Sequence, residues 1–148
     1  MLDEIIKKYE LIITEMPHKR KYYHLNSIRN FIIHYNEFGT IYYKKQVAEL
    51  LITYLDFAIN KHSIEQNEAK DIFYEYINPI GMIYLKRQNF RFYMQPSTII
   101  LWVGLSFIFY FLFNFSYIIY LLTFFIGVII FIPKYLNYKK NKVFGFDF

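Results

Sequence analysis

Apolar side chains in the first 78 residues recur every three or four positions, the spacing that places them on one face of an α-helix. A first stripe runs from Leu2 to Met16 and stops at Pro17, which cannot continue a helix. A second stripe closes at Gly39, and its inward positions are Leu25, Ile28, Ile32 and Tyr35. The pattern predicts two amphipathic helices.

Two more helices are indicated before residue 78. Thr40 is placed to cap the first of them, whose apolar stripe runs from Val47 to Ala58. Ser63 and Gln66 have the spacing of a capping box, which opens the second. The inward positions of this helix are Ala69, Ile72, Phe73, Tyr76 and Ile77. Because short connections favour antiparallel neighbours, we predict an all-α fold with a small helical bundle over residues 1–78.

The helical period weakens after residue 78, and we assign residues 79–96 to a basic and aromatic linker. Asn78-Pro79 and Gly81 are expected to kink or end the preceding helix. Aromatic and polar residues then alternate around Phe90 and Phe92. This alternation fits a short strand, an extended linker or a segment lying at a membrane surface.

Residues 97–133 form an apolar stretch of a different kind. No charged residue occurs between Phe92 and Pro133, and most positions are Ile, Leu, Phe, Tyr or Val. One helix over this stretch would be roughly 50 Å long, whereas the hydrocarbon core of a bilayer is about 30 Å thick. The polar residues around Phe115 divide the stretch into two halves, 98–113 and 117–132. The pattern therefore predicts a two-helix transmembrane hairpin after the bundle.

Three small residues are candidates for packing this hairpin. If the turn lies at Phe115, Gly104 and Gly127 lie at nearly equal depth, and Thr123 is one turn before Gly127. Small residues let helix backbones approach closely in lipid, so we expect these three to contact the other helix. The alternative is that glycine is simply a common residue in membrane helices.

Basic residues flank the apolar stretch on both sides. Residues 76–146 contain seven Lys or Arg residues and no acidic residue. The positive-inside rule then predicts a multi-pass protein of the inner (cytoplasmic) membrane with both termini in the cytoplasm. Residues 134–148 form a basic and aromatic tail, which either docks on a partner or, as we prefer, lies on the membrane. Contact with lipid headgroups is expected for Lys86, Arg87, Arg91, Lys134, Lys139 and Lys140.

One polar constellation stands on the second predicted helix. Arg29, Asn30 and His34 form the pattern Arg-Asn-x-x-x-His, and Asn30 and His34 share one helix face. This pattern resembles the six-residue signature of the HEPN superfamily, helical proteins many of which are metal-independent ribonucleases of toxin–antitoxin and antiphage systems. The resemblance implies a dimer with His34 as general acid and base, Arg29 as phosphate ligand and Asn30 as an orienting hydrogen bonder.

Two observations weigh against this interpretation. In many HEPN proteins the motif lies late in the bundle, whereas here it lies on the second helix of a small one. The alternative is that the three residues form a solvated helix face. The chain has no cysteine, and its histidines have no partner at metal-ligand spacing, so we expect neither a metal nor a cofactor.

Three function hypotheses follow from the sequence. The first is a membrane-anchored, HEPN-like ribonuclease or accessory effector that acts on RNA in antiphage defence. The second is a non-catalytic membrane subunit or anchor that docks a cytoplasmic protein. The third is a pore-forming hairpin, which is disfavoured because few polar residues are available to line a pore. The expected partners are the lipid bilayer and further copies of the chain, together with RNA in the first case and a cytoplasmic protein in the second.

Overall fold

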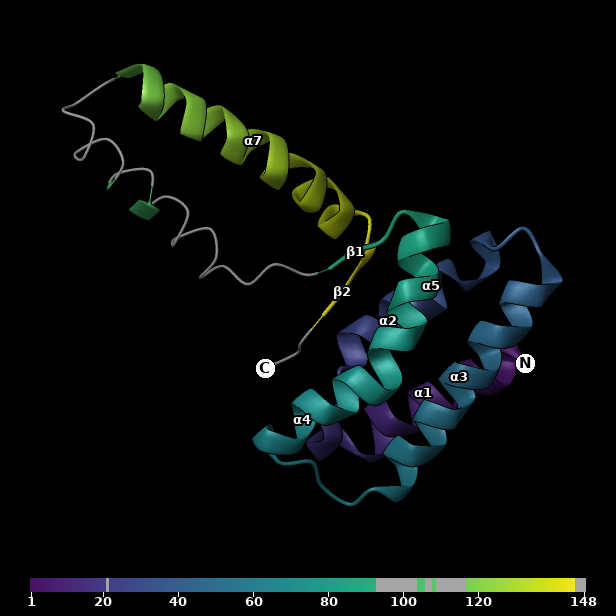
Figure 1. The fold of residues 1–148 in the computed structure, drawn as a ribbon. Coiled ribbons are helices and arrows are strands. Elements are labelled where there is room, and N and C mark those ends of the chain that lie inside the picture. Colours follow the sequence, from purple (N-terminus) through teal and green to yellow (C-terminus); the bar gives the residue numbers. More distant parts are fainter. Residues whose placement is uncertain (21, 93–103, 106–107, 109–116, 146–148) are drawn as a thin grey trace.

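The computed structural model describes residues 1–20, 22–92, 104–105, 108 and 117–145. The part it describes is mostly helical, which confirms the all-α prediction. Four helical segments pack into the bundle of Figure 1. They are α1 (Leu2–Glu15), α2 (Leu25–His34), α3 (Ile41–Asn60) and a rod of α4 (Gln66–Ile72), the π-helical turn η3 (Phe73–Ile77) and α5 (Asn78–Gln88). Short 3-10 turns follow α1 and α2, namely η1 (Pro17–Arg20) and η2 (Tyr35–Glu37).

The bundle core is built from the apolar stripes that the sequence predicts. Ile5 and Ile12 of α1 are fully buried, and α1 packs along α3. The stripe of α3 is buried at Val47, Leu51, Tyr54, Leu55 and Ala58. Thr40 is the residue before the first turn of α3, as predicted, although its side chain makes no capping hydrogen bond.

The rod containing α4 and α5 differs from the prediction at both of its predicted boundaries. Its capping box is formed by Glu65 and Glu68 rather than by Ser63 and Gln66, so α4 begins at Gln66. The rod also continues through Pro79 to Gln88. Proline is tolerated there because it lies in the first turn of α5, directly after the π-helical turn. The bundle therefore runs beyond the boundary that the sequence placed at residue 78.

Lys19 joins η1 to the end of α3. Its buried Nζ donates hydrogen bonds to the carbonyl oxygens of Ala58 (2.7 Å) and Ile59 (2.6 Å). These carbonyls belong to the last turn of α3, where backbone acceptors have no partner within the helix and where a cation is favoured by the helix dipole. Lys19 therefore has a structural role, and it fixes the corner between α1 and α2.

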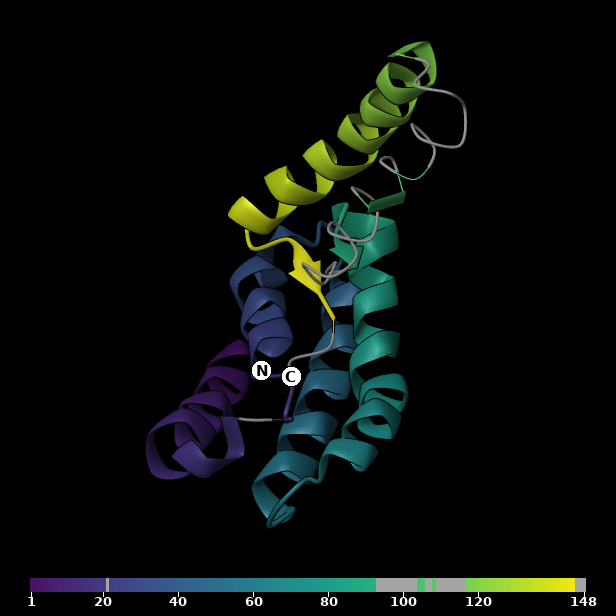
Figure 2. The ribbon, with the colours of Figure 1, turned by 90° about the vertical axis from the view of Figure 1, so that its left-hand side faces the viewer.

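Two short strands connect the bundle to its last helix. β1 (Arg91–Phe92) and β2 (Val143–Phe144) pair in parallel, with Arg91 opposite Val143 and Phe92 opposite Phe144. Between them in the sequence lies α7 (Tyr117–Lys139). In Figures 1 and 2 α7 extends away from the bundle, whereas β2 lies between α2 and α5. The segment after α7 thus returns to the bundle and becomes part of it.

The structure does not support the transmembrane hairpin. Among the described residues, none of the helices combines the length and the apolar character needed to cross a membrane. The predicted partner helix, residues 98–113, lies mostly outside the described residues. The prediction of a multi-pass protein of the inner membrane with both termini in the cytoplasm is overturned by this finding.

Candidate functional site

The polar face of α2 is the site that the sequence singled out, and it is buried. Ser27, Asn30 and His34 lie at positions i, i+3 and i+7, so they share one face of the helix. Their exposed fractions are 2%, 9% and 8%. Arg29, by contrast, is exposed. The interpretation of Asn30 and His34 as a solvated face is therefore wrong, and something other than water satisfies them.

Their partner is the stretch of chain after α7, residues 140–145, which we call the docked segment. The Ser27 hydroxyl donates to the carbonyl oxygen of Gly145 and accepts from its backbone N–H, both at 3.1 Å. Asn30 Nδ2 donates to the carbonyl oxygen of Val143 at 2.9 Å. His34 Nε2 donates to the carbonyl oxygen of Lys140 at 2.8 Å. The three side chains thus bind backbone groups of the docked segment.

The other edge of the docked segment is held by β1. The backbone N–H of Arg91 donates to the carbonyl oxygen of Lys142 at 3.0 Å. Hydrogen bonds from α2 side chains on one side and from β1 on the other pair backbone groups of this segment. Buried backbone N–H and C=O groups without such partners would lower the stability of the fold. The docked segment is therefore recognised through its backbone, and it lies between a helix and a strand.

An ionic chain reinforces the docking. Glu37 accepts a hydrogen bond from His34 Nδ1 at 2.7 Å with one carboxylate oxygen, and from Lys142 Nζ at 2.6 Å with the other. Burial works against the ionised form of Glu37, but the hydrogen bonds from Lys142 and His34 outweigh it and lower the pKa of its carboxyl group. Glu37 therefore links the end of α2 to the docked segment as a carboxylate.

The aromatic ring of Phe144 anchors the docked segment in the core. It is 1% exposed, and its ring centroid lies 5.9 Å from that of Phe31 and 5.4 Å from that of Phe92. Below it, α5 presents Gly81, where a Cβ would lie 2.2 Å from Phe144 Cε2. Only a residue without a side chain leaves room for this ring, so we call the space above Gly81 the Phe144 seat.

The positions of Arg29, Asn30 and His34 bear on whether the Arg-Asn-x-x-x-His pattern can form a catalytic site. The fold brings Asn30 and His34 together. Both ring nitrogens of His34 and the amide nitrogen of Asn30, however, already form hydrogen bonds with other residues of the same chain. Arg29 is exposed rather than buried with them. Proton transfer to a substrate hydroxyl requires a ring nitrogen within reach of that hydroxyl. In this arrangement the imidazole has no such nitrogen until the docked segment leaves.

The predicted contacts between the two hairpin helices lie largely outside the residues that the structure describes. Gly127 is buried within α7. A Cβ at Gly104 would meet nothing within 4 Å, so no close approach among the described residues requires glycine there. The side chain of Thr123 lies outside the described part. The pairing of Gly104, Thr123 and Gly127 stays a prediction.

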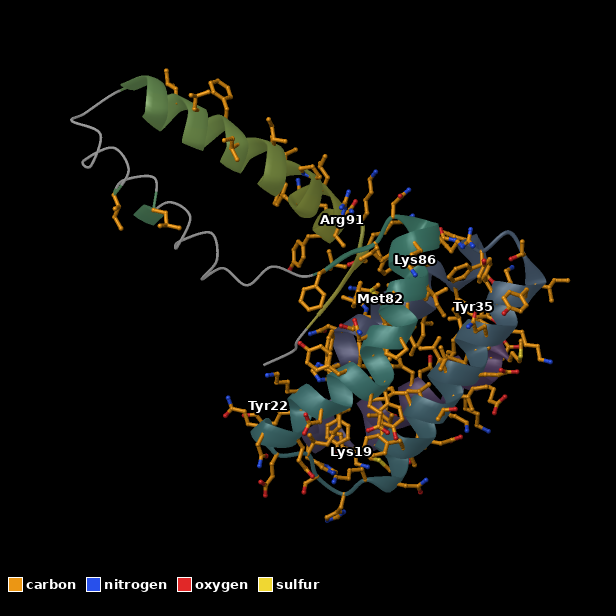
Figure 3. The ribbon with its side chains drawn as sticks, viewed as in Figure 1. Lys19, Tyr22, Tyr35, Met82, Lys86 and Arg91 are labelled. Carbon is orange, nitrogen blue, oxygen red and sulfur yellow. The ribbon has the colours of Figure 1, made fainter. Side chains whose placement is uncertain are left out.

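Most of the predicted headgroup contacts gather where α7 meets the bundle. Lys86 and Arg87 lie in the last turn of α5, Arg91 lies in β1, and Lys139 and Lys140 lie at the end of α7; all five are exposed. Figure 3 shows Lys86 and Arg91 on the side of the bundle nearest α7. The Arg87 guanidinium also lies over the ring of Tyr43, 4.5 Å from its centroid. The side chain of Lys134 lies outside the described part.

The sequence reasoning missed four residues of this site: Ser27, Glu37, Gly81 and Phe144. Ser27 was detectable, because it lies seven residues before His34 on the same helix face. The alternation around Phe144 is a signal for a strand, but nothing local indicates where that strand docks. In the part of the chain that the structure describes, no group of His, Asp or Glu residues could hold a metal ion.

Comparison with protein-family models, with curated proteins and with solved structures gives no match to this chain. The resemblance to the HEPN superfamily therefore depends on residues 29–34 and on the all-helical setting.

Proposed function

We propose that this chain is a non-catalytic docking subunit that assembles with further copies of itself through α7. The observation that carries the proposal is the exposed apolar surface of α7. At 100° per residue, its exposed large side chains cover more than half of the helix circumference. They are Leu121, Leu122, Phe124, Phe125, Ile126, Ile129, Ile132, Tyr135, Leu136 and Tyr138. An apolar surface of this extent is typical of an interaction site.

The site on α2 supports the non-catalytic part of the proposal. His34 and Asn30, which would be the catalytic residues of a HEPN-like site, form hydrogen bonds with the docked segment, and His34 also bonds Glu37. Their hydrogen bonds position the end of α7 on the bundle. In this proposal the bundle fixes the position of α7, and α7 is the element that contacts a second copy.

The charge pattern favours a second copy of the chain as the partner, in an antiparallel arrangement. From Tyr117 to Pro133 α7 carries no charge, so two copies do not repel one another along this surface. The cations lie at one end of α7, and antiparallel pairing separates the two basic ends by roughly 35 Å. That separation is several times the Debye length of about 8 Å at physiological salt, so their repulsion is screened.

Co-expression of two differently tagged copies tests the proposal. Capture of one tag is expected to recover the other, and Ile129→Lys, in the middle of the exposed surface, is expected to abolish this recovery. The matched control is Ile41→Lys, because Ile41 is 85% exposed but lies on α3. Recovery that is unaffected by Ile129→Lys would contradict the proposal, and so would a monomer that floats with phospholipid vesicles.

A further inference from the structure

The docked segment is held as a separate peptide would be held. Peptides that add a strand to a sheet edge gain affinity from main-chain hydrogen bonds and selectivity from a pocket for one side chain. Here the main-chain bonds come from Ser27, Asn30 and β1, and the pocket is the Phe144 seat above Gly81. His34 and Glu37 add side-chain bonds to Lys140 and Lys142, and the docked segment follows directly on α7.

That connection is a short turn with one unusual backbone conformation. Asn141 has a φ of 54°, in the left-handed region. The turn is closed by hydrogen bonds from the N–H of Asn141 to the oxygen of Tyr138 (3.0 Å) and from the N–H of Lys142 to the oxygen of Asn137 (2.8 Å). If Asn141 adopts an extended conformation instead, β2 leads away from its own bundle. Short hinges of this kind favour the exchange of identical segments between copies.

We propose that the surface formed by α2, β1 and the Phe144 seat is an exchangeable docking site, which accepts residues 142–145 of a second copy, the part that follows the hinge at Asn141, in place of its own. The chain's own segment fills this site in the structure, so an identical segment from a second copy fits it equally well. A second copy supplies the same Phe144 for the seat above Gly81 and the same Lys142 for Glu37. The exchange conserves every one of these contacts, and it does not depend on pairing through α7.

Disulfide trapping in the full chain tests the exchange, because the natural sequence has no cysteine to interfere. One tagged copy carries Ser27→Cys and a differently tagged copy carries Gly145→Cys. Ser27 Oγ lies 3.1 Å from the backbone N of Gly145, so the two positions are adjacent when the segment is docked, and the φ of Gly145 is not in the left-handed region that would disfavour a cysteine. On oxidation, a disulfide joining the two tags is expected at several times the yield given by Ile41→Cys in place of Ser27→Cys. The exposed Ile41 measures random collision.

Two further variants separate this inference from assembly through α7. Ile129→Lys, added to both copies, is expected to leave the disulfide yield unchanged, and this result supports exchange even if α7 does not pair. Gly81→Ala, added to the copy that carries Ser27→Cys, is expected to reduce the yield because it fills the Phe144 seat. As a second pair, Asn30→Cys with Val143→Cys guards against a fold defect at Ser27. Yields at the Ile41→Cys level for both pairs would overturn the proposal.

Discussion

At the scale of single residues, Gly81 and Phe144 depend on each other. The Phe144 ring lies against Phe31 and Phe92, so a side chain at position 81 would require these packed rings to shift. A Cβ at Gly81 would lie within 2.2 to 2.7 Å of three ring carbons. The glycine is therefore required by the ring above it.

We expect Gly81→Ala to lower the free energy of unfolding by about 1–3 kcal/mol, the usual cost of overpacking a core. Urea denaturation measures it. Gly39→Ala is the control: a Cβ at Gly39 would meet nothing within 4 Å, and its effect is expected to stay within about 0.5 kcal/mol. In a Phe144→Leu background the cost of Gly81→Ala should shrink, because contacting residues are not additive. Equal costs in both backgrounds would contradict the contact.

At the scale of elements, the docking of β2 against α2 contains a group sensitive to acid. Glu37 accepts hydrogen bonds from His34 on its own side and from Lys142 on the docked segment. These bonds lower its pKa in the folded chain, below the ordinary value of 4.5. The carboxylate thus stabilises the folded state above pH 4.5, and this contribution is lost as the pH falls through the lower, folded-state pKa.

We expect wild type to be more stable than Glu37→Gln at neutral pH, with a gap that narrows as the pH falls from 4.5 toward 3. The gap is modest, because the Glu37 side chain is 42% exposed and solvent screens its charge. Urea midpoints across this pH range measure it, and Glu15→Gln on the exposed end of α1 serves as the control. A gap that is constant from pH 7 to pH 3 would show that the carboxylate charge plays no part.

The same elements show how far the sequence could predict the fold. α1, α2 and α3 were predictable, because the stripe that buries Ile5 or Leu51 is a local pattern with the period of a helix. The docking of Val143 on Asn30 joins residues 113 positions apart, and no local pattern reports such a contact. Asn30 and His34 were found from their spacing, yet their partners were not. An apolar, charge-free stretch indicates burial, but it does not specify what buries it.

At the scale of the whole molecule, the bundle positions the docked segment, and the docked segment in turn positions α7. The bundle holds the docked segment, and the docked segment holds the end of α7 beside β1. Asn30 and His34, which the HEPN resemblance would make part of a ribonuclease site, form hydrogen bonds that hold the docked segment in place. If they were also catalytic, cleavage would require the docked segment to leave and the support of α7 to be lost at the same time.

Arg29 separates a structural from a catalytic role, because it is exposed and can be changed without disturbing the docked segment. We expect total RNA in bacteria that express wild type, Arg29→Ala or the exposed-cation control Lys45→Ala to remain equally intact. Circular dichroism should show the same helical content for all three. A catalytic role of the kind that the HEPN resemblance implies needs a cation to stabilise the charged transition state of RNA cleavage. RNA loss with wild type and Lys45→Ala, but not with Arg29→Ala, would therefore establish the ribonuclease and overturn the docking subunit.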